Sequence, residues 1–381
     1  MEMKKLVYPK IEPKFKNQKM PVGFVNDVRG WSFNRLEVEE AAKKRRLLTL
    51  DINMAGKGVC SLGCEHCFLG KYEGIPLEEL MIYLKDAKLL GLRSVKLIGP
   101  GEPLEDRGLL PFLRMLRAMD IIPLIFTKGH VIGDDELSAK KQGMDGRQLA
   151  EELKKLGVSI LLGTTSFNPE LEDAIVRRQG YHQARNEAII RLIEAGFNDF
   201  MPGEPTRLSF VCAPVTPRNI GEAYELYVWA RERHIQPVMA PTMIAGKALG
   251  NLCGLLPDGN GLVELYVRIN LWAIEHGVTT LEELREQGIA AYAGAAPCNQ
   301  VAVGMFLKGH TVLRCPGDDI SVQGDLREKS LTEIWEGSEN RRVYSGQYNN
   351  GCPPKEGKSF PERFFEKVMK LVEEHFGAAK Q

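Results

Sequence analysis

The hydrophobic residues between positions 46 and 250 form short apolar runs that alternate with longer amphipathic segments. Short apolar runs bounded by turn signals predict buried strands, whereas apolar residues spaced three or four apart predict helices. The predicted strands cover residues 47–54, 94–100, 121–129, 158–166, 207–216 and 236–244. The predicted helices between them cover residues 76–91, 109–120, 146–157, 181–196 and 219–235.

Strands that alternate with helices in this way indicate βα units and a parallel sheet. The strands show little polar alternation, which is typical of strands covered on both faces. About six units are present, fewer than a closed barrel contains. We therefore expect an α/β fold in which residues 46–250 form a partial, open (β/α)6 TIM-like barrel. Ligands should bind at the carboxyl ends of its strands.

The pattern changes on both sides of this region. Residues 1–45 form a lysine-rich N-terminal extension with one short predicted helix. Residues 251–381 should form a small C-terminal domain. It should contain a β-hairpin of residues 301–307 and 310–315 around Lys308–Gly309, and a helix over residues 330–345 capped by Ser330. The remaining predicted C-terminal elements are helices over residues 262–277, 280–287 and 361–377.

Composition narrows the class of protein. The chain has 381 residues and equal numbers of basic and acidic side chains, 50 of each, so neither a nucleic-acid nor an anionic membrane surface is expected. No segment has the apolar length of a signal peptide or a membrane span, and we expect a cytoplasmic protein. In that compartment the eight cysteines should be metal ligands or thiols rather than disulfides.

Three of the cysteines, Cys60, Cys64 and Cys67, lie within eight residues and are spaced C-x3-C-x2-C. Three thiolates on one tight loop can each bind one iron of a cubic cluster and leave the fourth iron without a protein ligand. A zinc knuckle or a disulfide pair are the alternatives. Zinc would require a fourth nearby ligand, and His66 is badly placed inside the loop to provide it.

The spacing of these cysteines resembles that of the radical S-adenosylmethionine superfamily, and the resemblance covers most of residues 47–250. It implies a [4Fe–4S] cluster on the three cysteines, whose open iron binds S-adenosylmethionine. By family position, His66 and Phe68 would lie near the adenine. Gly99, Gly101, Glu102 and Pro103 look like the family's Gly-Gly-Glu-Pro segment, with Pro100 replacing one glycine. Ser166, with Arg177 or Arg178, would bind the cofactor's carboxylate.

Three further cysteines lie near the C-terminus. Cys298 and Cys315 flank the predicted hairpin, and Cys352 follows the next predicted helix. This group looks like the auxiliary-cluster extension called twitch or SPASM in this superfamily, which implies one auxiliary [4Fe–4S] cluster. A full SPASM set has more cysteines, and Lys355 stands where a C-x2-C partner of Cys352 would be. Three buried thiols without a metal are the alternative.

The two remaining cysteines have less distinctive surroundings. Cys212 lies in an apolar strand and should be a core thiol. Cys253 follows the sixth predicted strand, near the barrel mouth. It could donate a hydrogen atom to a substrate radical as a catalytic residue, provide the fourth cluster ligand, or be a plain loop cysteine.

The resemblance implies a radical oxidoreductase or modifying enzyme that forms a 5′-deoxyadenosyl radical, abstracts a substrate hydrogen atom and oxidises or rearranges its substrate. An auxiliary cluster would transfer an electron or bind the substrate, and a flavodoxin or ferredoxin would donate electrons. Residues 1–45 are too short for the recognition domain of peptide-modifying relatives, which favours a small-molecule substrate over a short peptide. A peptide-modifying maturase and a zinc-stabilised binding protein without catalytic activity are the alternatives.

Overall fold

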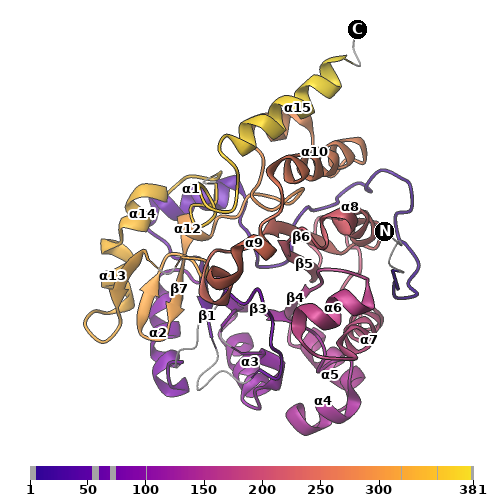
Figure 1. Ribbon diagram of the computed structural model, residues 1–381. Coiled ribbons are helices and arrows are strands. Elements are labelled where there is room, and N and C mark those ends of the chain that lie inside the picture. Colours follow the sequence, from indigo (N-terminus) through magenta and orange to yellow (C-terminus); the bar gives the residue numbers. More distant parts are fainter. Residues whose placement is uncertain are drawn as a thin grey trace.

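The chain folds around one sheet in the computed structural model, shown in Figure 1. The structure describes residues 6–53, 60–68, 74–99, 101–318, 320–349 and 351–378, apart from the side chains of 251–253 and 378. The strand order within these ranges is β6-β5-β4-β3-β2-β1-β7-β8-β9. The pairings of β1 to β6 are all parallel, and none of the described pairings joins β6 to β9. The predicted α/β class and the partial barrel are confirmed.

The six parallel strands lie within the predicted apolar runs. They are β1 (Thr49–Ile52), β2 (Ser94–Leu97), β3 (Ile122–Thr127), β4 (Ser159–Gly163), β5 (Leu208–Val215) and β6 (Gln236–Pro241). The predicted helices of the N-terminal extension and the barrel are α1 (Arg35–Lys43), α2 (Leu77–Leu89), α3 (Leu109–Ala118), α5 (Gly146–Lys155), α7 (Tyr181–Glu194) and α8 (Ile220–Glu232).

Several short helices have no counterpart in the predicted pattern. They are η1 (Pro103–Glu105), α4 (Asp135–Gln142), α6 (Pro169–Val176), η2 (Gly246–Asn251) and α9 (Leu252–Leu255). Ser138 is the one residue of α4 that is buried, so this helix has no apolar stripe from which its period could be recognised. α6 begins through local chemistry instead, because the Asn168 side chain accepts a hydrogen bond from the Leu171 amide.

The C-terminal residues continue the barrel sheet. β7 (Gly304–Lys308) pairs in parallel with β1, while β8 (Thr311–Leu313) and β9 (Val322–Asp325) follow in antiparallel order. Lys308 lies opposite Thr311, which confirms the predicted hairpin. The other C-terminal elements are α10 (Gly259–Glu275), α11 (Leu281–Gln287), α12 (Gln300–Val303), α13 (Leu331–Gly337), α14 (Glu339–Tyr344) and α15 (Phe364–Ala378).

Two details of the C-terminal prediction are wrong. Residues 301–303 belong to helix α12 and not to the first strand of the hairpin. The single helix expected over residues 330–345 is divided, because Ser338 has extended backbone angles and its side chain caps α14 by accepting from the Arg341 amide. The predicted cap at Ser330 is confirmed, since its hydroxyl accepts from the amide of Glu333.

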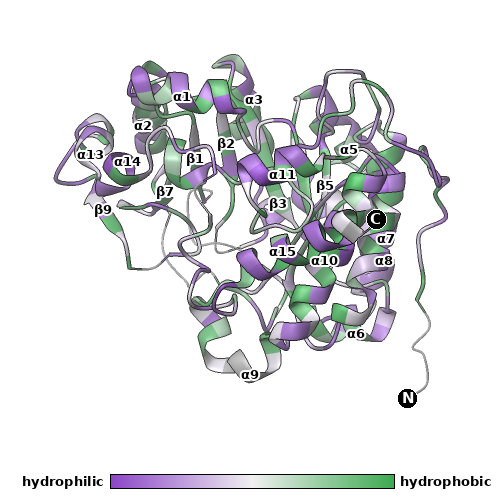
Figure 2. Cartoon of the chain, turned by 90° about the horizontal axis from the view of Figure 1, so that it is seen from above, coloured by the Kyte–Doolittle hydropathy of each residue, from purple (hydrophilic) through white to green (hydrophobic). Residues whose placement is uncertain are grey.

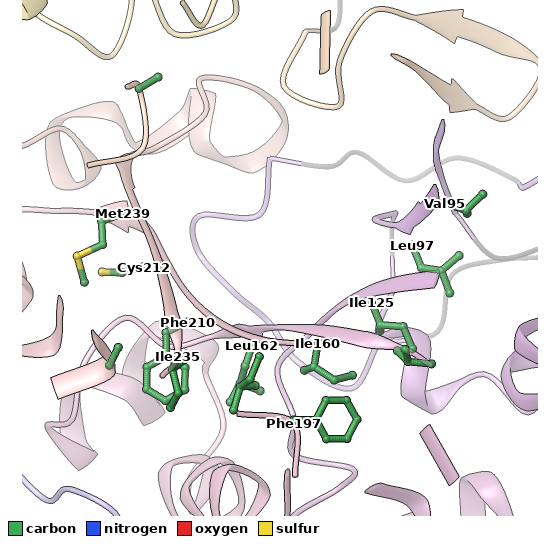
Figure 3. Close-up of a cluster of buried hydrophobic side chains, with 14 of the residues drawn as sticks. Val95, Leu97, Ile125, Ile160, Leu162, Phe197, Phe210, Cys212, Ile235 and Met239 are labelled. Atoms are coloured by element: carbon green, nitrogen blue, oxygen red, sulfur yellow. The ribbon is translucent and has the colours of Figure 1, made fainter. Parts of the chain in front are cut away.

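The strands bury side chains on both faces, as their lack of polar alternation predicted. One face packs against the helices and includes Leu97, Ile125, Ile160, Leu162 and Phe210, shown in Figure 3. Cys212 lies in this same cluster beside Met239 and is fully buried, as expected of a core thiol. On the other side of the sheet, Leu124 and Leu161 pack with Val28 of the N-terminal extension.

The N-terminal extension covers the amino ends of the barrel strands. Val28 forms a β-bridge with Thr206, directly before β5, and the Ser159 hydroxyl at the start of β4 donates to the Arg29 carbonyl at 2.9 Å. Trp31 packs against Phe126 inside the barrel. The opposite, carboxyl ends of the strands therefore carry the cysteine loop, which follows β1.

On the C-terminal side, α10 and α15 lie side by side in both views of the molecule (Figures 1 and 2), and the Tyr266 and Phe364 rings meet at 4.9 Å between centroids. Within the described ranges, every helix is too short or too polar to traverse a bilayer.

Candidate functional site

The cysteine loop brings its three thiols within electrostatic range of one another. Desolvation raises the pKa of the Cys60 and Cys64 thiols. Negative charge on Cys64 raises the pKa of Cys60 further, and negative charge on Cys67 does the same to Cys64. Because thiolates are the iron ligands of such clusters, this donor set fits the three irons that the spacing predicts.

A buried carboxylate anchors the start of this loop. Glu105 in η1 accepts hydrogen bonds from the Ser61 amide at 3.0 Å and the Ser61 hydroxyl at 2.7 Å. His130 lies 3.0 Å and Lys141 3.3 Å from the same carboxylate. Burial alone would raise the pKa of Glu105, but the hydrogen bonds from His130 and Ser61 outweigh it and lower the pKa to about 2. Glu105 is therefore ionised at neutral pH.

The end of α6 holds the middle of the loop. The Gly63 amide donates to the Val176 carbonyl at 2.9 Å, and the Arg177 side chain packs 3.3 Å from where a Cβ of Gly63 would be. Arg178 donates to the Ser61 hydroxyl at 3.2 Å. The structure thus brings both predicted arginines to the cysteine loop, where each already contacts the loop itself.

The segment after β6 holds the end of the loop. The Lys247 amide donates to the Cys67 carbonyl at 2.9 Å. Gly246 has a φ of +57°, and a Cβ there would lie 2.5 Å from the Phe68 carbonyl oxygen, so the close approach requires glycine. The main chain at Phe68, one of the predicted cofactor residues, is thereby fixed beside this segment.

The Gly-Glu-Pro segment joins the ends of three neighbouring strands. A Cβ on Gly99 would lie 2.1 Å from the Cβ of Asn53, directly after β1, and Gly101 has a φ of +125°. Glu102 accepts from the Thr127 hydroxyl at 2.5 Å and the Lys128 amide at 2.8 Å, at the end of β3. Pro103 begins η1, and Pro100 lies outside the described residues.

His66, within the loop, is buried, with 7% of its surface exposed. Burial lowers its pKa well below the usual value, and the Lys128 ammonium lowers it further, so the imidazole is neutral at pH 7. The Lys128 charge also lowers the pKa of Cys64. The predicted contact of His66 with an adenine stays a prediction.

Ser166, at the end of β4, lies in a buried network. Its hydroxyl donates to Glu222 at 2.5 Å, and its amide donates to Glu172 at 2.6 Å. Arg185 pairs with Glu172 at 3.4 Å, with both side chains fully buried. The Ser166 side chain is itself fully buried and is engaged with Glu222, so its predicted role toward the cofactor stays a prediction.

Asn219 occupies the N-cap position of α8, but its side chain makes no hydrogen bond that caps the helix. It accepts from the Thr216 amide at 2.6 Å and donates to the Thr165 carbonyl at 2.9 Å. This residue therefore connects the ends of β4 and β5.

The structure also brings together the three C-terminal cysteines, which come from three separate segments. Cys298 precedes α12, Cys315 follows β8, and Cys352 lies in the turn before α15. Burial raises the pKa of Cys315 well above its usual value, and charges on Cys352 and Cys298 raise it further. The pKa of Tyr292 is raised by burial and then by all three cysteines, so the three thiols lie within electrostatic range of the same buried ring.

Two buried charged residues lie next to this cysteine group. The Lys355 ammonium is fully buried 4.5 Å from the centroid of the Tyr292 ring. Asp51 of β1 is close enough to affect the pKa of Cys298 and Cys315, and it pairs with Lys96 of β2 at 3.6 Å. A donor set of three thiols beside a buried cation fits an anionic iron–sulfur cluster. Among the described residues, no three His, Cys, Asp or Glu side chains form a site for a single metal ion.

Cys253 falls in α9, and its side chain lies outside the described part of the chain, so its catalytic role stays a prediction. Sequence reasoning did not find Glu105, His130 or Asp51. Their roles depend on buried charge pairs between distant segments, and a single sequence carries no periodic signal for such pairs.

The comparisons with known proteins agree with this arrangement. The family model of the radical SAM superfamily matches residues 57–207. No protein of curated function matches the chain. Among solved structures, SuiB of Streptococcus suis bound to the precursor peptide SuiA is 15% identical, with a TM-score of 0.54, and the match covers 87% of this chain and 79% of SuiB.

A second similar structure is native anSMEcpe with bound AdoMet and a peptide, Cp18Cys. It is 14% identical, with a TM-score of 0.56, and the match covers 87% of this chain and 97% of anSMEcpe. The cofactors of the superfamily are a [4Fe–4S] cluster and S-adenosylmethionine. Residues 57–207, with their cysteine loop at the carboxyl end of β1, therefore match the radical S-adenosylmethionine superfamily.

Proposed function

We propose that the protein is a radical S-adenosylmethionine enzyme that uses one auxiliary [4Fe–4S] cluster to modify its substrate. The observation that supports the second cluster is that Cys298, Cys315 and Cys352, from three separate segments, lie within electrostatic range of the same buried ring, Tyr292, and that charges on Cys352 and Cys298 raise the pKa of Cys315. The domain boundaries at residues 45/46 and 250/251 belong to the same proposal.

Two parts of the barrel rim have proposed roles toward the cofactors. Cys60, Cys64 and Cys67 would hold the first cluster, and Glu102 with the glycines at 99 and 101 would lie against the amino group of the cofactor. When bound, the cluster and S-adenosylmethionine supply the 5′-deoxyadenosyl radical that abstracts a hydrogen atom from the substrate. The protein side chains bind, orient and exclude water from these groups.

We propose a small molecule as the substrate and a cytoplasmic flavodoxin or ferredoxin as the electron donor. A short peptide is the second candidate, because SuiB and anSMEcpe, two similar folds, were each crystallised with a peptide. To distinguish these classes, separated small-molecule and peptide fractions of a cell extract are added to reduced enzyme. The fraction that stimulates 5′-deoxyadenosine formation identifies the class.

The cluster content is tested by iron analysis of anaerobically reconstituted protein. We expect a brown protein with about eight irons, because two cubic clusters hold four each. Replacing Cys60, Cys64 and Cys67 by alanine should leave about four irons, as should replacing Cys298, Cys315 and Cys352.

Cys212→Ala is the matched control, because this buried thiol belongs to the hydrophobic core, and it should keep the full iron content. A C-terminal triple variant with undiminished iron would remove the auxiliary cluster from the proposal. A colourless protein with stoichiometric zinc would instead support a zinc-stabilised binding protein.

A further inference from the structure

Lys355 has a buried charge without a counter-charge among the described residues. Its side chain has 0% exposure, and its ammonium has no hydrogen-bond partner in the described part of the chain. The ammonium lies over the face of the Tyr292 ring, 4.5 Å from the centroid. Burying an ammonium is costly unless it is paired, so this arrangement calls for an anion.

The nearby carboxylates do not supply that anion. Glu356, the next residue, accepts a hydrogen bond from the Cys352 amide at 3.0 Å. Asp51 pairs with Lys96. The groups whose charge acts on Lys355 are instead three thiols, Cys352, Cys315 and Cys298.

The turn that carries Cys352 holds the Lys355 backbone next to that cysteine. The Lys355 amide donates to the Cys352 carbonyl at 2.8 Å, so the chain reverses between the two residues. Lys355 occupies the third position after Cys352, where a C-x2-C pair would have its second thiol. The chain therefore has a cation in place of a fourth thiolate.

We propose that Lys355 is the counter-charge of the cluster held by Cys298, Cys315 and Cys352, and that it favours the reduced state of this cluster. The inference rests on the auxiliary cluster proposed above. A thiolate-bound cluster is anionic and gains a further negative charge when it accepts an electron. A fixed ammonium in a low-dielectric interior stabilises the reduced state more than the oxidised one.

The test uses full-length protein in which Cys60, Cys64 and Cys67 are alanine, so that only the auxiliary cluster can form. Its midpoint potential is measured by dithionite titration followed by EPR. With Lys355→Met, we expect reduction to become about tenfold less favourable, a potential about 59 mV more negative. Lys355→Arg should restore most of the difference. Lys358→Met is the matched control, because Lys358 lies in the same segment with an exposed side chain, and it should leave the potential unchanged.

The iron-free protein gives a second readout of opposite sign. Without a cluster the buried ammonium destabilises the folded protein, because its charge is desolvated and unpaired. Lys355→Met should therefore raise the thermal unfolding midpoint, and Lys358→Met should not. A Lys355→Met protein that folds but loses its cluster, while Lys355→Arg keeps it, would also support the counter-charge.

The failures of the two proposals are distinguishable. If the background variant binds no iron, the auxiliary cluster itself is wrong. If it binds iron and Lys355→Met leaves the potential unchanged or raises it, the role of Lys355 is wrong. A lower unfolding midpoint for iron-free Lys355→Met would show that the ammonium has a partner within the fold, and would overturn the inference as well.

Discussion

At the scale of single residues, the cysteine loop depends on a carboxylate that lies outside its motif. Glu105 receives the Ser61 amide and hydroxyl, and its side chain is 1% exposed. Hydrogen bonds to charged groups contribute about 1.5–3 kcal/mol each when they are buried. The position of the first thiols is therefore set in part by a residue in η1, some forty positions later in the chain.

We predict that Glu105→Gln destabilises the iron-free protein by about 2 kcal/mol, because a neutral amide loses the charge that pairs with His130 and Lys141. The variant should also lower the iron content of the first site and leave the C-terminal site loaded. Urea denaturation and iron analysis of the two cysteine-triple backgrounds measure these effects. Glu204→Gln is the control, since its ion pair with Arg29 is exposed.

The pH dependence has a defined sign. The pKa of Glu105 is lowered from 4.5 to about 2, so its contribution is fully present above 4.5 and is lost as the pH falls toward 2. Glu105→Gln should flatten the stability curve in this window. If the stability of Glu105→Gln fell between pH 4.5 and 2 as steeply as that of the unaltered protein, other carboxylates would be responsible for the loss.

Sequence reasoning identified the residues that belong to a short motif with a characteristic spacing or characteristic neighbours. Cys60, Cys64 and Cys67 are recognisable from their spacing alone, and Glu102 from its glycine and proline neighbours. Glu105 lies two residues after that motif, yet nothing local distinguishes it from a surface glutamate. Its importance arises from burial and from His130 on another strand exit, which only the fold brings together.

At the scale of elements, the positions of the strands and longer helices can be predicted from their hydrophobic period. The pairing of elements that are distant in the sequence cannot. The hairpin of β7 and β8 could be predicted because its partners are adjacent in sequence. The parallel pairing of β7 with β1, which places Thr49 opposite Gly304, joins residues some 250 positions apart and has no local signal.

The segment after β6 lies against the cysteine loop and against the chain just after Cys315. It carries Gly246, which abuts the Phe68 and Cys67 carbonyls. Its Met243 sulfur would lie 2.5 Å from a Cβ on Gly317, two residues after Cys315. A larger side chain at Gly246 should therefore displace the cysteine loop.

We predict that Gly246→Ala lowers the iron retained by Cys60, Cys64 and Cys67. A Cβ at this position would meet the Phe68 backbone at 2.5 Å, and the positive φ disfavours alanine as well. Gly250→Ala is the matched control four residues later, where a Cβ meets nothing within 4 Å. Equal iron content in the two variants would show that the loop adapts without loss.

At the scale of the whole molecule, the barrel interior connects the N-terminal extension with the C-terminal cysteines. Trp31 of the extension lies beneath the Lys96 ammonium, 4.9 Å from the ring centroid to the nitrogen. Lys96 donates to Gln300 of α12 at 2.6 Å and pairs with Asp51. A buried ion pair between two barrel strands thus lies next to the element that follows Cys298.

We predict that Lys96→Met destabilises the iron-free protein by about 3–5 kcal/mol, because it leaves the Asp51 carboxylate buried without a partner. Adding Asp51→Leu should recover most of this loss, since a buried ion pair replaced by apolar residues of similar volume is often neutral. A double-mutant cycle by urea denaturation measures the coupling. Additive single effects would show that the two side chains do not act as a pair.

The pH dependence distinguishes this pair from Glu105. Burial raises the pKa of Asp51 from 3.8 to about 6, although Lys96 acts in the opposite direction. The folded protein then binds more protons than the unfolded chain between these values, so stability due to Asp51 falls as the pH rises from about 3.8 to 6. Lys96→Met should extend this fall to higher pH, because it removes the charge that lowers the pKa of Asp51. Asp51→Leu should abolish it in either background, and a fall that persists without Asp51 would assign the titration to another buried group.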